Sequence, residues 1–174
     1  MTKDQLAKRV RESAYLEGDF TLRSGRKSKY YLDKYLFETQ PDVLAALGEF
    51  FAARCGLNVT LIAGAELGGV ALAAATSMSA GKPFVIVRNA KKDYGTSKKF
   101  EGKLAAGDVV LLVEDIATTG GQVLEAARDI VAAGATVQKI VAVIDRQEGA
   151  RENIEQAGFV FESLLTKADL GIKE

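Results

Sequence analysis

Short apolar runs alternate with segments of helical spacing along most of this chain, and this alternation constrains the fold more than any other feature. The apolar runs predict buried strands over residues 59–63, 84–87, 108–113, 137–144 and about 159–165. Helical segments are predicted from Pro41 to about residue 55, after residue 69, over 122–133 and over 148–157. Strands that alternate with helices pair in parallel through right-handed crossovers. The sequence therefore predicts an α/β fold, with a central, mostly parallel sheet flanked by helices.

The first 37 residues follow a different pattern from the rest of the chain. Leu6, Val10 and Ala14 have helical spacing, so a helix is predicted over residues 3–16 with Thr2 as its cap. Residues 20–23 and 30–35 have an extended pattern, and a turn is predicted between them at residues 24 and 25. A length of 174 residues fits one domain, over residues 1–174, with a substantial core.

One segment, VVLLVEDIATTGG at residues 109–121, carries the strongest indication of function. Its apolar run ends in Glu114 and Asp115, a loop of small residues follows, and a helical pattern begins at Gln122. The backbone N–H groups of a Gly-rich loop and a helix N-terminus hold phosphate well. Carboxylates repel phosphate but accept hydrogen bonds from sugar hydroxyls. The order of residues favours a sugar phosphate as ligand, although two acids that merely end a strand and cap a helix would look similar.

Composition excludes several classes of function. The chain has 23 basic and 23 acidic residues, so its net charge gives no general attraction to nucleic acid. It has no histidine, which excludes a histidine base or metal ligand. No apolar run reaches the roughly 18 residues of a membrane span, and the charged N-terminus does not resemble a signal peptide. The single cysteine, Cys55, fits a reducing compartment, so we expect a cytoplasmic protein without nucleic-acid or membrane partners.

Basic residues cluster in two places on this neutral chain, residues 23–34 and residues 88–103. Such clusters suggest an anionic ligand, although solvated surfaces are the usual place for lysines. The second cluster contains two glycines and has weak periodicity, which is typical of a long mobile loop or hairpin.

Residues 109–121 resemble the phosphoribosyl pyrophosphate (PRPP) signature of the type I phosphoribosyltransferases. In that family two adjacent acids follow a hydrophobic strand and precede a Thr/Gly loop. The resemblance implies that Glu114 and Asp115 contact the ribose hydroxyls and that residues 117–121 wrap the 5′-phosphate. It also implies the type I phosphoribosyltransferase fold, with a small N-terminal hood over about residues 1–37 and a mobile loop over about 88–103.

Three more segments resemble the orotate-using members of that family: FTLRSGRKSKYYLDKYLF at 20–37, VRNAKKDYG at 87–95 and IDRQEG at 144–149. The implied reaction joins orotate to PRPP and yields orotidine 5′-monophosphate and diphosphate. The resemblance implies Lys92 and Asp115 as catalytic residues. It implies orotate contacts from Arg23, Tyr31, Thr118 and Arg146. It implies PRPP contacts from Arg88, Asn89, Lys92, Tyr94, Glu114, Asp115, Ile116, Ala117, Thr118, Thr119, Gly120, Gly121 and Gln122.

The chain departs from the family pattern at three positions. Tyr94 stands where histidine is usual, Asn89 where lysine is frequent, and Gly68 where longer bacterial members have lysine. Two of the implied roles also have simpler alternatives. Arg146 has acidic neighbours, Asp145 and Glu148, with which it could form a salt bridge, and an aromatic pair that includes Tyr31 could serve only in packing.

The resemblance further implies Mg²⁺ as cofactor, held mainly by substrate and water rather than by protein ligands. It implies a homodimer in which the mobile loop covers the neighbouring site. Three other functions stay open at this point: a purine or uracil phosphoribosyltransferase, a non-catalytic PRPP-sensing regulator, and a structural domain with a vestigial site. A carboxylate-binding arginine at position 146 argues against a neutral base.

Overall fold

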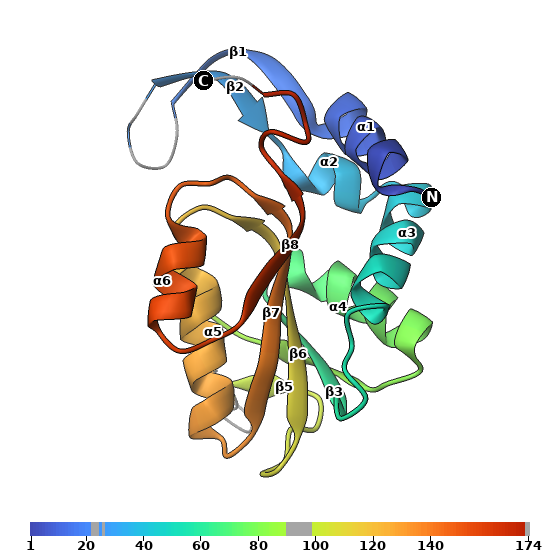
Figure 1. Cartoon of the computed structure of the whole chain (residues 1–174), viewed down its shortest axis with the longest axis vertical. Coiled ribbons are helices and arrows are strands. Elements are labelled where there is room, and N and C mark those ends of the chain that lie inside the picture. Colours follow the sequence, from blue (N-terminus) through green and yellow to red (C-terminus); the bar gives the residue numbers. More distant parts are fainter. Residues whose placement is uncertain (22–24, 26, 90–98, 173–174) are drawn as a thin grey trace.

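The computed structural model describes residues 1–21, 25, 27–89 and 99–172. Within these residues a six-stranded sheet has the order β5-β4-β3-β6-β7-β8 (Figure 1). Its strands are β3 (Leu61–Ala65), β4 (Phe84–Val87), β5 (Phe100–Glu101), β6 (Val109–Ala117), β7 (Thr136–Asp145) and β8 (Phe161–Thr166). All neighbouring strands pair in parallel except β5, which pairs antiparallel with β4. The predicted α/β fold with a mostly parallel sheet is confirmed.

Helices cover both faces of the sheet (Figure 1). On one face lie α3 (Pro41–Ala52) and α4 (Gly68–Ala80), and on the other lie α5 (Gly121–Ala132) and α6 (Ala150–Gln156). Each layer has its own hydrophobic core, because successive strand residues point to opposite faces: Leu111 and Val113 pack under α3 and α4, whereas Val110 and Leu112 pack under α5 and α6. The sheet is therefore buried on both sides, as parallel sheets are.

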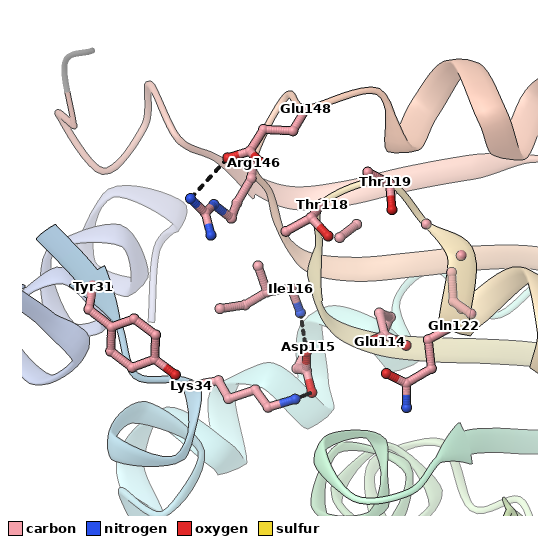
Figure 2. Close-up of a pocket in the computed structure, with 14 residues that line it drawn as sticks. Tyr31, Lys34, Glu114, Asp115, Ile116, Thr118, Thr119, Gln122, Arg146 and Glu148 are labelled. Carbon is pink, nitrogen blue, oxygen red and sulfur yellow. Dashed lines mark hydrogen bonds and ion pairs between the residues drawn. The ribbon is translucent and has the colours of Figure 1, made fainter. Parts of the chain in front are cut away.

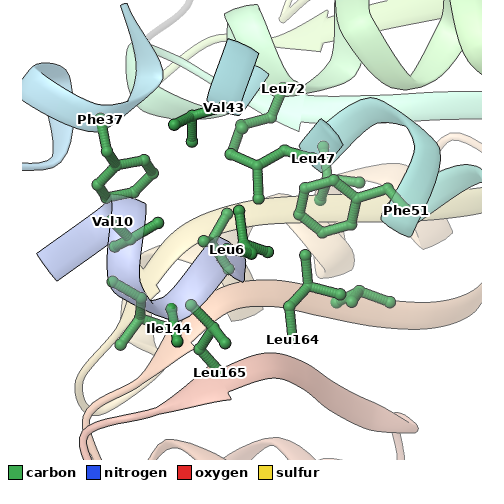
Figure 3. Close-up of a cluster of buried hydrophobic side chains, with 14 of the residues drawn as sticks. Leu6, Val10, Phe37, Val43, Leu47, Phe51, Leu72, Ile144, Leu164 and Leu165 are labelled. Carbon is green, nitrogen blue, oxygen red and sulfur yellow. The ribbon is translucent and has the colours of Figure 1, made fainter. Parts of the chain in front are cut away.

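A hood lies over one end of the sheet, formed by α1 (Lys3–Ala14), the antiparallel hairpin β1 (Tyr15–Thr21) and β2 (Lys27–Leu32), and α2 (Lys34–Glu38) (Figure 1). Its apolar side chains join the core of the α3–α4 layer: Leu6 and Val10 of α1 meet Phe37 of α2 and Leu164 of β8 (Figure 3). The hood is thereby fixed against the sheet, and its inner surface faces the end of the sheet where the strands β6 and β7 finish.

Most predicted elements are present, but several of their predicted limits are wrong. The helix expected over residues 3–16 ends at Ala14 because β1 begins at Tyr15. The strand expected over residues 30–35 ends at Leu32, since the Asp33 side chain caps a helix by accepting from the Tyr35 N–H. The expected strand over 108–113 continues to Ala117.

Glu114 and Asp115 therefore lie within β6, whereas the sequence predicted that they would follow the strand. Pairing of β6 with β7 continues past Glu114 to Ala117, which is opposite Asp145. The hydrogen-bonded ladder, rather than hydrophobicity, sets this limit. No helix among the described residues has both the length and the apolar character needed to cross a membrane.

Candidate active site

The carboxyl ends of β3, β6 and β7 meet at one edge of the sheet, beneath the hood. From β3 the chain first moves outward to β4, and from β6 it moves the other way to β7 and β8, so β3 and β6 flank the topological switch point. Ligands of open α/β sheets bind at such a point. A cavity of about 850 Å³ lies there. It is lined by Tyr31, Lys34, Glu114, Asp115, Ile116, Ala117, Thr118, Thr119, Gly120, Gly121, Gln122, Val123, Arg146 and Glu148.

Asp115 is the anchor of the cavity floor (Figure 2). Only 3% of the residue is exposed. Its Oδ1 accepts from the Ile116 N–H, and its Oδ2 accepts from the Lys34 ammonium at 2.6 Å. Burial lowers the pKa of Lys34, but the hydrogen bond to Asp115 and the charge of that carboxylate outweigh it and raise this pKa above its usual value. The acid that is predicted to hold ribose is thus fixed by a cation from the hood.

Two more acids lie near this ion pair. Burial, followed by the charge of Asp115, raises the pKa of Glu114 well above its usual value. Glu38 of α2 is 3% exposed, and burial followed by the charge of Asp115 raises its pKa to about 8. The Glu38 Oε1 has no hydrogen-bond partner among the described residues. Burial and the charge of Asp115 therefore favour the protonated form of both acids, and Lys34 is the cation that pairs with Asp115.

Gly68, the first residue of α4, allows this arrangement by its lack of a side chain. A Cβ atom on residue 68 would lie 1.6 Å from the Asp115 Oδ2 and 3.0 Å from the Lys34 Nζ. Any side chain there would displace the ion pair. Longer bacterial members of the family have lysine at this position. Glycine here leaves the space that Asp115 and Lys34 occupy.

The loop after β6 is built to receive an anion. Helix α5 begins at Gly121, and the first N–H groups of a helix have no partner within it. Gly120 has φ 78°, a left-handed conformation that glycine adopts without strain. Helix α6 supports the loop from behind, because the Asn153 side chain donates to the Thr119 carbonyl at 2.9 Å. The loop thus presents its backbone to the cavity in one fixed shape.

Arg146 lies on another wall of the cavity, directly after β7 (Figure 2). Its backbone N–H donates to the Ala117 carbonyl at 2.9 Å, which ties its position to the end of β6. Its guanidinium forms an ion pair with Glu148 at 2.9 Å and lies 5.9 Å from the ring centre of Tyr30. The Arg146 Nε is buried and has no hydrogen-bond partner among the described residues. Both the ligand role and the salt bridge expected for this residue are thus compatible with its place.

The two tyrosines of β2 have different surroundings. Tyr30 stacks on Tyr15 with ring centres 5.7 Å apart and packs against the core. Tyr31 is 42% exposed, lies 5.6 Å from the Phe20 ring and lines the cavity. Of these two tyrosines, Tyr31 is therefore the one whose ring is open to the cavity.

Three predicted ligands gather around Glu66 at the edge of the site: Arg88 and Asn89, which do not line the cavity, and Gln122, which does. The Glu66 carboxylate accepts from the Asn89 N–H at 2.7 Å and lies 3.9 Å from the Arg88 guanidinium. The Gln122 amide donates to the Glu66 carbonyl and to the Asn89 Oδ1, both at 3.1 Å. Gln122 also lines the cavity, so it links the phosphate loop to the β3–α4 loop. Arg23, Lys92 and Tyr94, which were also predicted to contact ligands, lie outside the described residues.

The predicted ligands did not include Lys34, Glu38 or Glu66 of this region. Lys34 belongs to a basic cluster in the sequence, but its partner Asp115 is 81 positions away, and no local pattern shows that contact. Glu66 lies shortly after the strand that the sequence predicts over residues 59–63, at the carboxyl end of that strand. That position was its only signal.

The residues of the cavity fit a Mg²⁺ ion that arrives with a phosphorylated substrate. Among the described residues, no group of three or more acidic or cysteine side chains is arranged to hold a metal by itself. Glu114 and Asp115 nevertheless offer hard carboxylate oxygens. Mg²⁺ commonly binds through one or two carboxylates, with substrate phosphates and water completing its shell.

Comparisons with known proteins cover almost the whole chain. Residues 28–171 match a family model described as a phosphoribosyl transferase domain. A protein of Natronomonas pharaonis named orotate phosphoribosyltransferase is 43% identical over 171 residues, which is 98% of each chain. The crystal structure of Mycobacterium tuberculosis H37Rv orotate phosphoribosyltransferase with Fe(III) dicitrate has a TM-score of 0.88 and 32% identity. A second structure of that enzyme, with PRPP, has a TM-score of 0.82 and 31% identity. Both cover 97% of this chain and 98% of theirs.

Proposed function

The chain belongs to the phosphoribosyltransferase family, and from this premise we propose that it is an orotate phosphoribosyltransferase of pyrimidine nucleotide synthesis. It transfers the ribose 5-phosphate group of PRPP to orotate and releases diphosphate and orotidine 5′-monophosphate. One observation carries the proposal: a buried acid, a phosphate-binding loop and an arginine line a single cavity of about 850 Å³.

The pentose lies over the end of β6. Glu114 and Asp115 accept hydrogen bonds from its hydroxyls, and the bonds to the Asp115 carboxylate, which is paired with Lys34, are strong. The 5′-phosphate lies in the loop of residues 117–122, against the N-terminus of α5. Because both parts are fixed, C1 of the ribose is presented to the open part of the cavity, between Arg146 and the hood.

The base lies between Tyr31 and Arg146. The planar guanidinium of Arg146 can bind the orotate carboxylate with two parallel hydrogen bonds, which a lysine cannot do. Its ion pair with Glu148 keeps the guanidinium in place before orotate arrives. A neutral base such as uracil or adenine has no carboxylate to offer, so this site favours orotate.

Cleavage of the bond at C1 leaves positive charge on the sugar and a departing anion, as in glycoside hydrolysis. Catalysis therefore requires positive charge around the diphosphate. Lys92 and Arg88, at the loop expected over 88–103, serve this purpose when that loop closes, and closure excludes water. When bound, Mg²⁺ adds positive charge at the diphosphate oxygens.

The same proposal includes a homodimer whose loops reach the neighbouring site. Apolar side chains near the cavity support it: Tyr35 and Leu36 of α2 and Leu67 of the β3–α4 loop are exposed. A chain with one cysteine, half-buried Cys55, is compatible with the reducing cytoplasm, where we expect the enzyme to act.

An absorbance assay of orotate consumption tests the proposed function. The expected result is PRPP-dependent loss of orotate with release of one diphosphate per orotate, stimulated by Mg²⁺. Parallel reactions with uracil, adenine and guanine should show no turnover. Turnover with one of these bases and none with orotate would assign a different transferase, and PRPP binding without any turnover would favour a sensing regulator.

A further inference from the structure

Lys34 is a cation of the cavity for which the proposed mechanism has so far given no role. It begins α2, and Asp33 caps that helix, so the hood fixes the backbone from which the side chain extends. Its ammonium crosses to the sheet and donates to Asp115 at 2.6 Å. The side chain nevertheless remains 32% exposed. An ammonium has three protons, so Lys34 can hold Asp115 and still donate to a ligand.

Among the described residues that line the cavity, Lys34 and Arg146 are the two that carry positive charge. They reach it from different elements and lie on either side of Ile116 (Figure 2). Arg146 already has an acidic partner on its own loop, Glu148. Lys34 instead pairs with Asp115, the acid that accepts hydrogen bonds from the ribose hydroxyls when the substrate binds. The cavity thus has two separate positive regions, which suits a ligand with anionic groups at two places besides the 5′-phosphate.

The chemistry of the transfer indicates which anion belongs to each region. In a displacement at C1 with inversion, the incoming base and the departing group lie on opposite faces of the sugar. With the orotate carboxylate at Arg146, the diphosphate leaves on the other side, toward Lys34 and the N-terminus of α4. The lack of a side chain at Gly68 leaves room for the Lys34 ammonium on that side, because a Cβ there would lie 3.0 Å from the Lys34 Nζ.

We propose that Lys34 binds the diphosphate of PRPP and stabilises it as it departs, while Asp115 holds the ammonium in place. This assignment rests on the proposed function. Lys34 is thereby a substrate-contacting residue supplied by the hood. The ion pair with Asp115 also has a second effect: it places the cation next to the acid that accepts the ribose hydroxyls, so sugar and leaving group are positioned by one pair.

A comparison of two ligands tests the role of Lys34 without turnover. PRPP and ribose 5-phosphate share the sugar and the monoester, and only PRPP has a diphosphate. Titration calorimetry at fixed Mg²⁺ should show that Lys34→Met weakens PRPP binding about tenfold or more, and inorganic diphosphate similarly. Ribose 5-phosphate should change less than about threefold, and Lys34→Arg should retain most of the PRPP affinity.

Lys139→Met is the matched control, because Lys139 is also a half-buried lysine paired with an acid, Glu162 at 2.5 Å, and lies away from the cavity. It should leave both affinities unchanged. If Lys34→Met weakened both ligands equally, Lys34 would serve only to hold Asp115, and the proposal would be wrong. The ratio of the two affinities within one variant does not depend on how much of the protein is folded. If the unmodified protein bound PRPP but did not consume orotate, the proposed function would fail while this ratio still tested Lys34.

Discussion

The Lys34 ammonium donates a 2.6 Å hydrogen bond to the Asp115 carboxylate and joins the hood to the end of β6. These residues are 81 positions apart in the sequence, and their contact closes the floor of the cavity. Asp115 is therefore placed for the ribose hydroxyls by two elements at once: the β6 ladder fixes its backbone, and Lys34 fixes its side chain.

Asp115→Asn should weaken PRPP and ribose 5-phosphate binding by about 10–100-fold, because the amide cannot make the charge-assisted bonds of the carboxylate. Ribose 5-phosphate should lose affinity because its hydroxyls lose the carboxylate, and PRPP should lose at least as much, because Asp115 also holds the Lys34 ammonium in place. Calorimetric titration of the two ligands measures this. Asp108→Asn, directly before the start of β6 and away from the cavity, should leave both affinities unchanged. Normal ribose 5-phosphate binding by the Asp115→Asn protein would remove Asp115 from the sugar site.

Gly120→Ala should distort the phosphate loop. Residue 120 has φ 78°, where a side chain costs about 1–2 kcal/mol, and its Cβ would lie 3.1 Å from the Ile154 side chain. The variant should bind ribose 5-phosphate several-fold more weakly. Gly107→Ala is the control: Gly107 has φ 88° and no atom within 4 Å of the added Cβ, and it precedes the opposite end of β6. An equal loss of affinity in both variants would mean that loop shape is not the cause.

Arg146→Lys should raise KM for orotate by about 10–100-fold while KM for PRPP changes little. The reason is that lysine keeps the charge but cannot make two parallel hydrogen bonds to a carboxylate. Steady-state kinetics with each substrate varied in turn provide the measurement. Arg151→Lys, on the exposed side of α6, serves as control. An unchanged KM for orotate in Arg146→Lys would mean that Arg146 does not bind orotate and serves only in its salt bridge with Glu148.

Lys92→Ala should lower kcat at least tenfold without lowering the thermal stability, because a cation of the loop over 88–103 is expected to act on the departing diphosphate. Turnover and thermal unfolding of the same preparation separate the two effects. Lys103→Ala, at the other end of that segment, should turn over normally. A folded Lys92→Ala protein with near-normal kcat would contradict the role.

Glu38→Gln should make stability less dependent on pH. Burial and the charge of Asp115 raise the pKa of Glu38 to about 8, so the folded protein keeps a proton that the unfolded chain loses above its ordinary value of 4.5. Glu38 therefore causes no loss of stability below about pH 4.5, and the loss that it causes grows as pH rises towards 8. The gain in Tm from Glu38→Gln should grow from pH 5 to pH 8, whereas Glu49→Gln, on the exposed face of α3, should give a constant difference. A gain that is equal at both pH values would contradict this account.

The sequence predicted the parts of the fold that depend on local pattern. The apolar runs around Val85 and Leu112 gave strands, because both faces of a parallel sheet are buried. Helix α2 was not predicted, since the five residues from Lys34 to Glu38 are too few to show a period of 3.6. The end of β6 was placed too early, because charged residues were taken to end the strand, whereas its pairing with β7 continues past them.

The part of the candidate site that is contiguous in the sequence could be predicted. Residues 114–122 were predicted as a group and line one cavity, together with Tyr31 and Arg146. Lys34 could not be predicted, because its importance arises from a contact between the hood and the sheet. The space left by Gly68 likewise depends on the side chains that surround it in the folded chain.

A crystal structure with PRPP bound is the most direct test of the central claim, that one acid pair and one loop hold the phosphorylated pentose. We predict the ribose hydroxyls within about 3 Å of the Glu114 or Asp115 carboxylates and the 5′-phosphate against the N–H groups of residues 118–122. PRPP bound elsewhere, or bound here with its diphosphate in the loop of residues 118–122 and its ribose away from both acids, would contradict the account.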